Sequence, residues 1–172
     1  MKYRLVGSEM CIRDRPLIAS IISGFFGKFI GDRSSEIVTS LLVSISAIFS
    51  FLVFYEVIVN QYQENIIIAT WISSGSLEVN WSMNIDPLSS VMLVVVTSVS
   101  ALVHIYSIGY MSHDPHKPRF MAYLSLFTFA MLMLVTSDNF IQLFFGWEGV
   151  GLCSYFLIGF WLSLIHISEP TR

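Results

Sequence analysis

One apolar stretch, from Asn139 to Trp161, constrains what this chain can fold into more than any other feature. A helix of this length, at about 1.5 Å per residue, is long enough to cross the roughly 30 Å hydrocarbon core of a bilayer. One carboxylate, Glu148, lies close to its midpoint. A charge at that depth costs roughly 2.5–3.5 kcal/mol on insertion scales, and acids placed there are by default functional. The stretch predicts a membrane helix in which Glu148 is neutral part of the time and relays protons.

Composition supports a membrane protein throughout. The 172 residues are 55% hydrophobic and only 12% charged, with a mean hydropathy of +0.71, whereas ordinary soluble domains carry about 25% charged residues. A net charge of -3 without a basic face predicts no nucleic-acid partner. We find no nucleotide-binding or redox motif, so no cofactor is expected on this chain.

No metal site or disulfide is expected either. Cys11 and Cys153 lie in no ligand-like or paired spacing, and Cys153 is read as a small packing residue. His113 and His116 are spaced three apart, but they lie in a polar loop with no helix to align them.

The hydropathy pattern predicts an all-α transmembrane helix bundle of about five spans, the first of them partial. Asp86-Pro87 marks the start of the third span, because aspartate is a good N-cap and proline at the first helical position loses no hydrogen bond. Asp138 is expected to cap the fifth. The expected spans cover residues 16–30, 36–59, 86–110, 119–136 and 139–161.

The two ends of the sequence do not fit this pattern. Residues 1–15 hold four of the nine Lys and Arg residues without any period, and residues 163–172 interrupt an apolar helix. Both resemble translated adapter DNA, so we expect them to be non-native tails. The transmembrane domain is then expected to occupy residues 16–162.

Between the second and third spans, the period of the sequence changes. Apolar and polar residues alternate from Leu77 to Ile85, which is the pattern of a half-buried strand. Residues 66–72 are rich in β-branched side chains, and Ser73 to Ser76 separate the two runs. We expect a β-hairpin lying on the membrane surface, with Trp71 and Trp81 at the interface; an irregular loop is the alternative.

The third span carries a polar stripe. Thr97, Ser100, His104 and Ser107 follow one another at steps of three, four and three, so they share a helix face. In lipid such a stripe must face protein or water. Two interpretations stay open: hydrogen bonding between helices, and a proton-accepting role for His104, whose pKa is naturally closest to neutral.

Loop charges predict the orientation. Lys28 and Arg33 lie in the first connection, and Lys117 and Arg119 in the third, whereas the second and fourth connections carry no Lys or Arg. The positive connections should face the cytoplasm or its equivalent. The hairpin and the turn before the fifth span should then lie on the opposite side.

The fifth span also places Glu148 on a defined face. Phe144, Phe145, Leu152 and Tyr155 share this face with it. Glycines at positions 146, 149, 151 and 159 permit close contact between helices. The alternative to a proton-transfer role is a structural acid bonded to a neighbouring helix.

Several of these segments resemble a known family. Asp86-Pro87-Leu88-Ser89, the run from Val103 to Met111, Arg119-Phe120, and above all the Gly-Trp-Glu-Gly-Val-Gly motif around Glu148 are similar to chain 5 (subunit L) of NADH–quinone oxidoreductase, respiratory complex I. The resemblance covers residues 16 to 162. It implies an antiporter-like membrane subunit in which Glu148 belongs to the proton channel and His104 lies on the third helix.

The resemblance also implies what lies outside this sequence. The family's chain is several times longer, and its essential buried lysine lies on a later helix, so we expect an N-terminal part of such a chain. NADH, FMN, iron–sulfur clusters and quinone would be held by other subunits of the complex. The partners implied are other membrane subunits, the lipid bilayer and protons, in a bacterial or mitochondrial inner membrane.

Two other functions fit the same residues less well. The first is the large subunit of a multi-subunit cation/proton antiporter, or a membrane subunit of a related hydrogenase, since these share the fold and the buried glutamate. The second is a purely structural bundle whose polar groups only pack helices together.

Overall fold

The computed structural model describes residues 2–61, 63–75, 77–112, 114 and 116–168. Within them the chain forms five helices and a two-stranded antiparallel sheet. The elements, in chain order, are α1 (Lys2–Ile30), α2 (Asp32–Asn60), β1 (Glu64–Ser74), β2 (Leu77–Ile85), α3 (Pro87–Tyr110), α4 (Lys117–Val135) and α5 (Phe140–Ser168). The predicted helical bundle with a hairpin between the second and third spans is confirmed.

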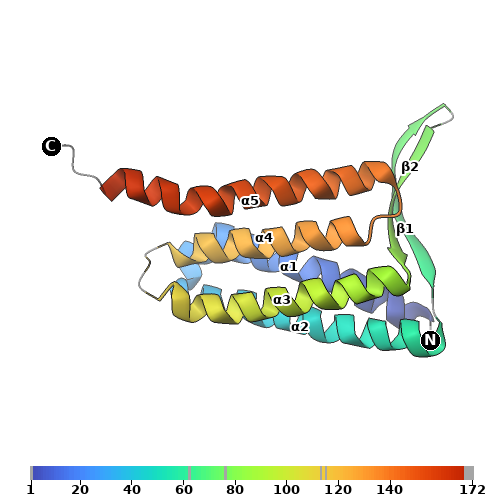
Figure 1. Ribbon diagram of the computed structural model, residues 1–172, viewed down its shortest axis with the longest axis horizontal. Helices are drawn as coiled ribbons and strands as arrows, with labels where there is room; N and C mark the ends of the chain where they lie inside the picture. Colours follow the sequence, from blue (N-terminus) through green and yellow to red (C-terminus); the bar gives the residue numbers. More distant parts are fainter. Residues whose placement is uncertain (1, 62, 76, 113, 115, 169–172) are drawn as a thin grey trace.

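The helices run side by side, and the hairpin crosses one end of the bundle (Figure 1). Helices α1 to α4 pack together, and α5 lies along α4 on the outside. The hairpin and the α4–α5 turn lie at one end, and the α1–α2 and α3–α4 connections lie at the other. This places the positively charged connections together, as the loop charges predict.

Four helices in the described part of the chain are long and apolar enough to cross a membrane: α2, α3, α4 and α5. Large apolar side chains such as Phe51, Leu102 and Phe144 are exposed on their outer faces. Exposed apolar surface of this extent is expected where lipid is the solvent.

The first two helices are separated at Gly31. Its φ of +87° lies in a region that glycine adopts without steric cost, and α2 starts at the next residue. The end expected for the first span, at residue 30, is confirmed. Helix α1 itself is continuous from Lys2 and contains Pro16, so the helix extends through the boundary expected at residue 16. Likewise α5 continues to Ser168, and residues 169–172 lie outside the described part.

The bundle interior is lined by small hydroxyl side chains. On α2, Thr39, Ser46 and Ser50 are buried, and Ser46 Oγ donates a 2.6 Å hydrogen bond to the carbonyl oxygen of Ile12 on α1. Small residues let helix backbones approach closely where lipid provides no hydrophobic driving force. The face of α2 that carries these hydroxyl side chains therefore contacts other helices.

The hairpin is attached to the start of α5. Gln142 is fully buried; its Nε2 donates to the Ser82 carbonyl oxygen (2.7 Å), and its Oε1 accepts from the Ser82 amide (3.1 Å). Trp71, Trp81 and Phe145 form an edge-to-face cluster with ring centroids 5.1–5.8 Å apart. The hairpin is thus held against the helical bundle by both polar and aromatic contacts.

One predicted cap is confirmed and one is wrong. Asp86 Oδ1 accepts a 2.6 Å hydrogen bond from the Ser89 amide at the start of α3, as predicted. At the start of α5, Asn139 Oδ1 accepts from the Gln142 amide (2.8 Å), whereas Asp138 accepts from the Ser82 hydroxyl (3.3 Å). The cap falls on Asn139 because α5 begins one residue later, at Phe140.

Candidate functional site

Glu148 lies on the outward face of α5. The residues predicted to share its face, among them Phe144, Leu152 and Tyr155, are all exposed, as is Glu148 itself. A carboxylate on such an apolar face is costly in hydrocarbon, because lipid offers it neither water nor a hydrogen bond. In a membrane this face is therefore expected to be covered by protein or to contact water.

The opposite face of α5 is fixed against α4 by glycine. A Cβ built on Gly146 would lie 2.9 Å from the backbone of Leu134, and one on Gly149 would lie 3.4 Å from Ala130 Cβ. A Cβ built on Gly151 would have no neighbouring atom within 4 Å in the described part of the chain. Of the glycines predicted to permit close contact, Gly146 is the one that the helix contact requires, and its position orients Glu148 away from α4.

His104 is fully buried between α3 and α4. Its Nδ1 lies 2.8 Å from the Ser100 carbonyl oxygen, and its Nε2 lies 3.0 Å from Ser125 Oγ on α4. A carbonyl oxygen can only accept, so Nδ1 carries a proton. When the ring is neutral, Nε2 is its basic nitrogen and accepts from the Ser125 hydroxyl.

A second interhelical contact extends this group. Ser100 Oγ lies 2.5 Å from Thr128 Oγ1, and Thr128 Oγ1 also donates to the Leu124 carbonyl oxygen (3.0 Å). We call Ser100, His104, Ser125 and Thr128 the His104 cluster. The predicted polar stripe of α3 thus faces protein, and hydrogen bonding between helices, one of the two interpretations of the stripe, is present.

The two predicted site residues are not brought together. His104 bonds to residues of α3 and α4, whereas Glu148 lies on the far side of α5, and α4 lies between α3 and α5 (Figure 1). No hydrogen bond or ion pair joins them within the described residues. A proton could pass between His104 and Glu148 only through other groups that lie between them.

An ionisable pair that the sequence analysis did not single out lies near the α3–α4 connection. Glu36 of α2 is 2% exposed, and its Oε1 lies 4.0 Å from Lys117 Nζ at the start of α4. A signal was present in the sequence, because Glu36 and Ser40 are four residues apart at the start of an apolar run and so share a face. Its partner is far away in sequence and could not be identified from spacing.

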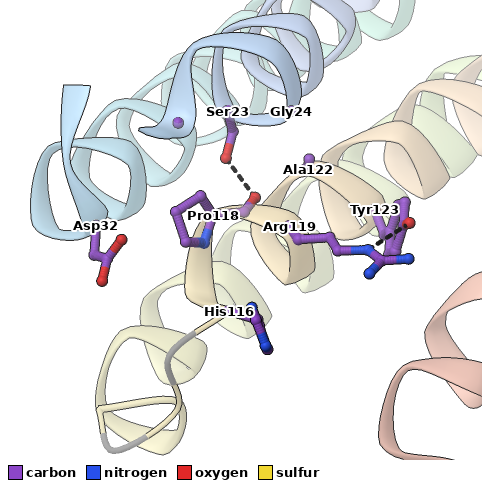
Figure 2. A pocket seen from close by; sticks show the side chains of 9 residues that line it. Ser23, Gly24, Asp32, His116, Pro118, Arg119, Ala122 and Tyr123 are labelled. Carbon is purple, nitrogen blue, oxygen red and sulfur yellow. Dashed lines mark hydrogen bonds between the residues drawn. The ribbon is translucent and has the colours of Figure 1, made fainter. Parts of the chain in front are cut away.

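A pocket of about 370 Å³ opens beside this pair, between the ends of α1, α2 and α4 (Figure 2). Ser23 Oγ donates a 2.6 Å hydrogen bond to the Pro118 carbonyl oxygen at its wall, and Arg119 Nε donates to the Tyr123 hydroxyl (2.8 Å). Asp32 and His116 also line it. This pocket has polar and apolar lining residues and opens at the end of the bundle that carries the positive connections.

The described residues contain no group of three or more His, Cys, Asp or Glu side chains arranged to hold a metal ion. His113, one of the two loop histidines considered above, lies outside the described residues. Cys153 is buried, as expected for a packing residue.

These features define the class of protein. The chain is a polytopic integral membrane protein with a polar cluster around a fully buried histidine and an intramembrane carboxylate on a separate helix. The family model that describes the N-terminus of complex I chain 5 (NADH-ubiquinone oxidoreductase) matches residues 71–121.

Relatives extend this match over most of the chain. NADH-ubiquinone oxidoreductase chain 5 of Arabidopsis thaliana is 57% identical over 90% of this chain, and NADH-quinone oxidoreductase subunit L of Rickettsia conorii is 51% identical over 86%. The chain belongs to this family. It spans about a quarter of the length of these relatives, 23% and 22% respectively.

A solved structure shares the fold. The membrane-bound sulfane sulfur reductase, an archaeal respiratory membrane complex, contains a chain that superposes with a TM-score of 0.69. The match covers 86% of this chain and 29% of that chain, at 16% sequence identity. At that identity the match establishes the fold.

Proposed function

We propose that this chain is part of a proton-translocating membrane subunit of an NADH–quinone oxidoreductase, with Glu148 as its proton-carrying carboxylate. The observation that carries the proposal is Glu148 itself, the one charged residue between Phe140 and Phe160 of a membrane-spanning helix. An acid is retained at such a costly position where its charge is used. The 57% identity to chain 5 of complex I supports the enzyme assignment.

The mechanism requires a partner for Glu148. A nearby positive charge favours the carboxylate, and loss of that charge favours the neutral acid. The family resemblance implies a lysine on a later helix as this partner, and the exposed face of α5 leaves Glu148 open to such contact. Glu148 would alternate between a lysine-paired carboxylate and an unpaired neutral acid, taking up one proton and releasing it in each cycle.

His104 is proposed as a second, auxiliary proton acceptor. Its Nε2 lone pair faces the Ser125 hydroxyl, which can donate a proton to Nε2 and take another from a neighbour. The cluster also ties α3 to α4, so we expect its replacement to be less harmful to pumping than that of Glu148.

The redox chemistry is assigned to other subunits. NADH oxidation, FMN, the iron–sulfur clusters and quinone reduction would lie outside this chain, which would receive their energy through contacts with other membrane subunits. The side of the bundle that carries Lys117 and Arg119 would face the cytoplasm or the mitochondrial matrix.

The first test is Glu148→Gln in the intact enzyme with the full-length subunit. We expect a large loss of proton pumping and of coupled quinone reductase activity, because glutamine has a similar shape but cannot carry the proton. The measurements are dye-reported acidification in proteoliposomes and the NADH–quinone rate in the same preparation. Glu56→Gln is the matched control, since Glu56 lies near the end of α2, hydrogen-bonded to Asn60.

Two results would contradict the assignment. Unchanged pumping by a fully assembled Glu148→Gln enzyme would eliminate the relay role and leave a structural bundle. His104→Ala, measured alongside, should cause a smaller loss; an equally severe loss in an assembled enzyme would show that the two residues are ranked wrongly.

A cation/proton antiporter or hydrogenase subunit is the second candidate. The fold shared with the archaeal sulfane sulfur reductase complex supports keeping it, because that complex is not named as an NADH dehydrogenase. Neighbouring genes separate the candidates: redox subunits accompany complex I, and small antiporter subunits accompany the antiporter. Sodium-dependent transport without quinone reduction would favour the antiporter.

A further inference from the structure

Glu36 is a buried acid that the mechanism above does not use. Its side chain is 3% exposed, and the nearest cation, Lys117 Nζ, is 4.0 Å from its Oε1, which is the outer limit for an ion pair. The other charged groups that act on it, Asp32 and Arg33, lie on its own helix. Burying a carboxylate with one distant partner is expensive, since desolvation is compensated only by good geometry and further hydrogen bonds.

Two buried oxygens on this face of α2 have no hydrogen-bond partner among the described residues. They are Glu36 Oε1 and Ser40 Oγ, one helical turn apart. An unpaired buried polar atom is costly, and in native proteins such atoms are generally satisfied by a protein group or by ordered water. Glu36 and Ser40 thus form a polar strip on α2, whose two unpaired oxygens water would satisfy.

The strip lies at the same level of the bundle as the His104 cluster. Val43 and Ala47 of α2 pack on Ala101 of α3, and the two helices run in opposite directions (Figure 1). Three residues before Val43 on α2 (Ser40) and three residues after Ala101 on α3 (His104) therefore lie at the same height along the bundle. Ser40 lies at the level of His104.

The same count places the outer end of the strip. Glu36 lies seven residues before Val43 on α2. Seven residues after Ala101 on α3 is the position just beyond Ser107, so Glu36 lies at about the level of Ser107. The Ser107 hydroxyl is buried and donates to the Val103 carbonyl oxygen (2.7 Å). Glu36 thus lies between the His104 cluster and the bundle end that carries the α3–α4 connection.

The outer end of the strip lies beside the pocket of Figure 2. Ser23, which lines that pocket, is 2.5 Å from Ser35 Oγ, and Ser35 directly precedes Glu36. Pro118, which also lines it, directly follows Lys117. The pocket wall therefore adjoins the Glu36–Lys117 pair through the residues next to each of them, Ser35 and Pro118.

We propose that Glu36 and Lys117 form a proton entry site at this end of the bundle, which delivers protons through water at Ser40 to the His104 cluster. In the resting state Glu36 is a carboxylate facing the Lys117 ammonium. A proton from the pocket adds to the carboxylate oxygen and gives the neutral acid. That acid passes its proton to water beside Ser40, and Glu36 returns to the carboxylate facing Lys117. The inference rests on the proposed proton-translocating function.

The alternative role for this pair is a clamp between α2 and α4. An ion pair that only holds α2 against α4 depends on the two charges. It does not depend on the exchange of a proton or on the Ser40 hydroxyl. Ser40 Oγ bonds to no protein group among the described residues, so its removal breaks no contact between helices. Ser40→Ala therefore separates the two roles without threatening the fold.

The experiment uses the intact enzyme with the full-length subunit, reconstituted in liposomes. Glu36→Gln should slow proton translocation several-fold, Glu36→Asp should restore part of it, and Ser40→Ala should slow it measurably with unchanged thermal stability. Glu56→Gln, on the same helix, is the matched control and should leave the rate unchanged. Infrared difference spectra recorded across pH provide a readout besides activity: a protonated-carboxyl band should be lost in Glu36→Gln alone.

The outcomes separate this inference from the proposed function. If Glu148→Gln abolishes pumping while Glu36→Gln and Ser40→Ala pump normally, the entry site is wrong and the function stands. If Glu36→Gln fails to assemble, normal pumping by Ser40→Ala together with an unaltered carboxyl band in Glu36→Asp overturns the entry site. If Glu148→Gln also pumps normally, the proposed function itself fails.

Discussion

At the scale of single residues, the His104 cluster gives a direct test of an interhelical hydrogen bond. Ser125→Ala removes the donor to His104 Nε2 and leaves that nitrogen buried without a partner. We expect the subunit to lose about 1 kcal/mol of stability, in line with typical hydrogen-bond deletions and with the modest values found in membranes. The measurement is the denaturant midpoint of the purified complex, followed by a signal from this subunit.

Ser98→Ala is the matched control for that variant. Ser98 also lies on α3, but its Oγ is buried without a hydrogen-bond partner among the described residues, so its loss should be neutral or slightly stabilising. Equal destabilisation by the two variants would mean that the bond to His104 contributes nothing and that only side-chain volume matters.

The residue scale also shows where sequence reasoning succeeds and where it stops. The burial of His104 follows from spacing alone, because steps of three and four residues fix a helix face whatever the partner is. Spacing does not identify Lys117 as the partner of Glu36, because that contact depends on which helix ends meet in the folded bundle. The cap of α5 lies at Asn139, one residue after the predicted position, Asp138. Aspartate and asparagine are both good caps, so residue type alone does not show which of two adjacent residues caps the helix.

At the scale of elements, the contact between α4 and α5 depends on Gly146. Alanine there would bring its Cβ to 2.9 Å from the backbone of Leu134, which cannot move aside as a flexible side chain would. We expect Gly146→Ala to push α5 away from α4 and to cost about 1–3 kcal/mol, the usual range for overpacking. Thermal unfolding of the assembled complex measures this cost.

Gly151→Ala provides the comparison, since nothing lies within 4 Å of its built Cβ within the described part of the chain. Gly151→Ala should leave the α4–α5 contact unchanged. It should leave the stability of α5 unchanged or raise it slightly, because alanine has a higher helix propensity than glycine. Equal losses in the two variants would show that α5 has a second tight contact on its exposed face.

The elements themselves were largely predictable. The change from helical to alternating periodicity located the hairpin, and the glycine before Asp32 located the break between α1 and α2. The sequence does not reveal which of several glycines touches a neighbour, because that depends on how α5 is rotated about its axis. It likewise predicted two strands without predicting the two register shifts between them, which arise from local backbone irregularity.

At the scale of the whole molecule, one buried side chain makes two of the hydrogen bonds between the hairpin and the membrane bundle. Gln142 of α5 satisfies both the amide and the carbonyl group of Ser82 in β2. Gln142→Ala leaves these two buried backbone groups unpaired, at roughly 1–3 kcal/mol for each group. That cost favours release of β2 from α5, while the helices, which pack through other contacts, stay in place.

Hydrogen–deuterium exchange of the intact complex measures this release. In Gln142→Ala we expect faster exchange around Ser82 and unchanged exchange in α3 and α4. Asn80→Ala is the control: Asn80 contributes only its backbone carbonyl oxygen to the contact with Asn139, and the substitution keeps that atom. If exchange around Ser82 is unchanged in Gln142→Ala, the remaining contacts are sufficient to hold the hairpin, among them the aromatic cluster and the hydrogen bond from the Asn84 amide to the Thr136 carbonyl oxygen. Gln142 then serves only to fill its buried site.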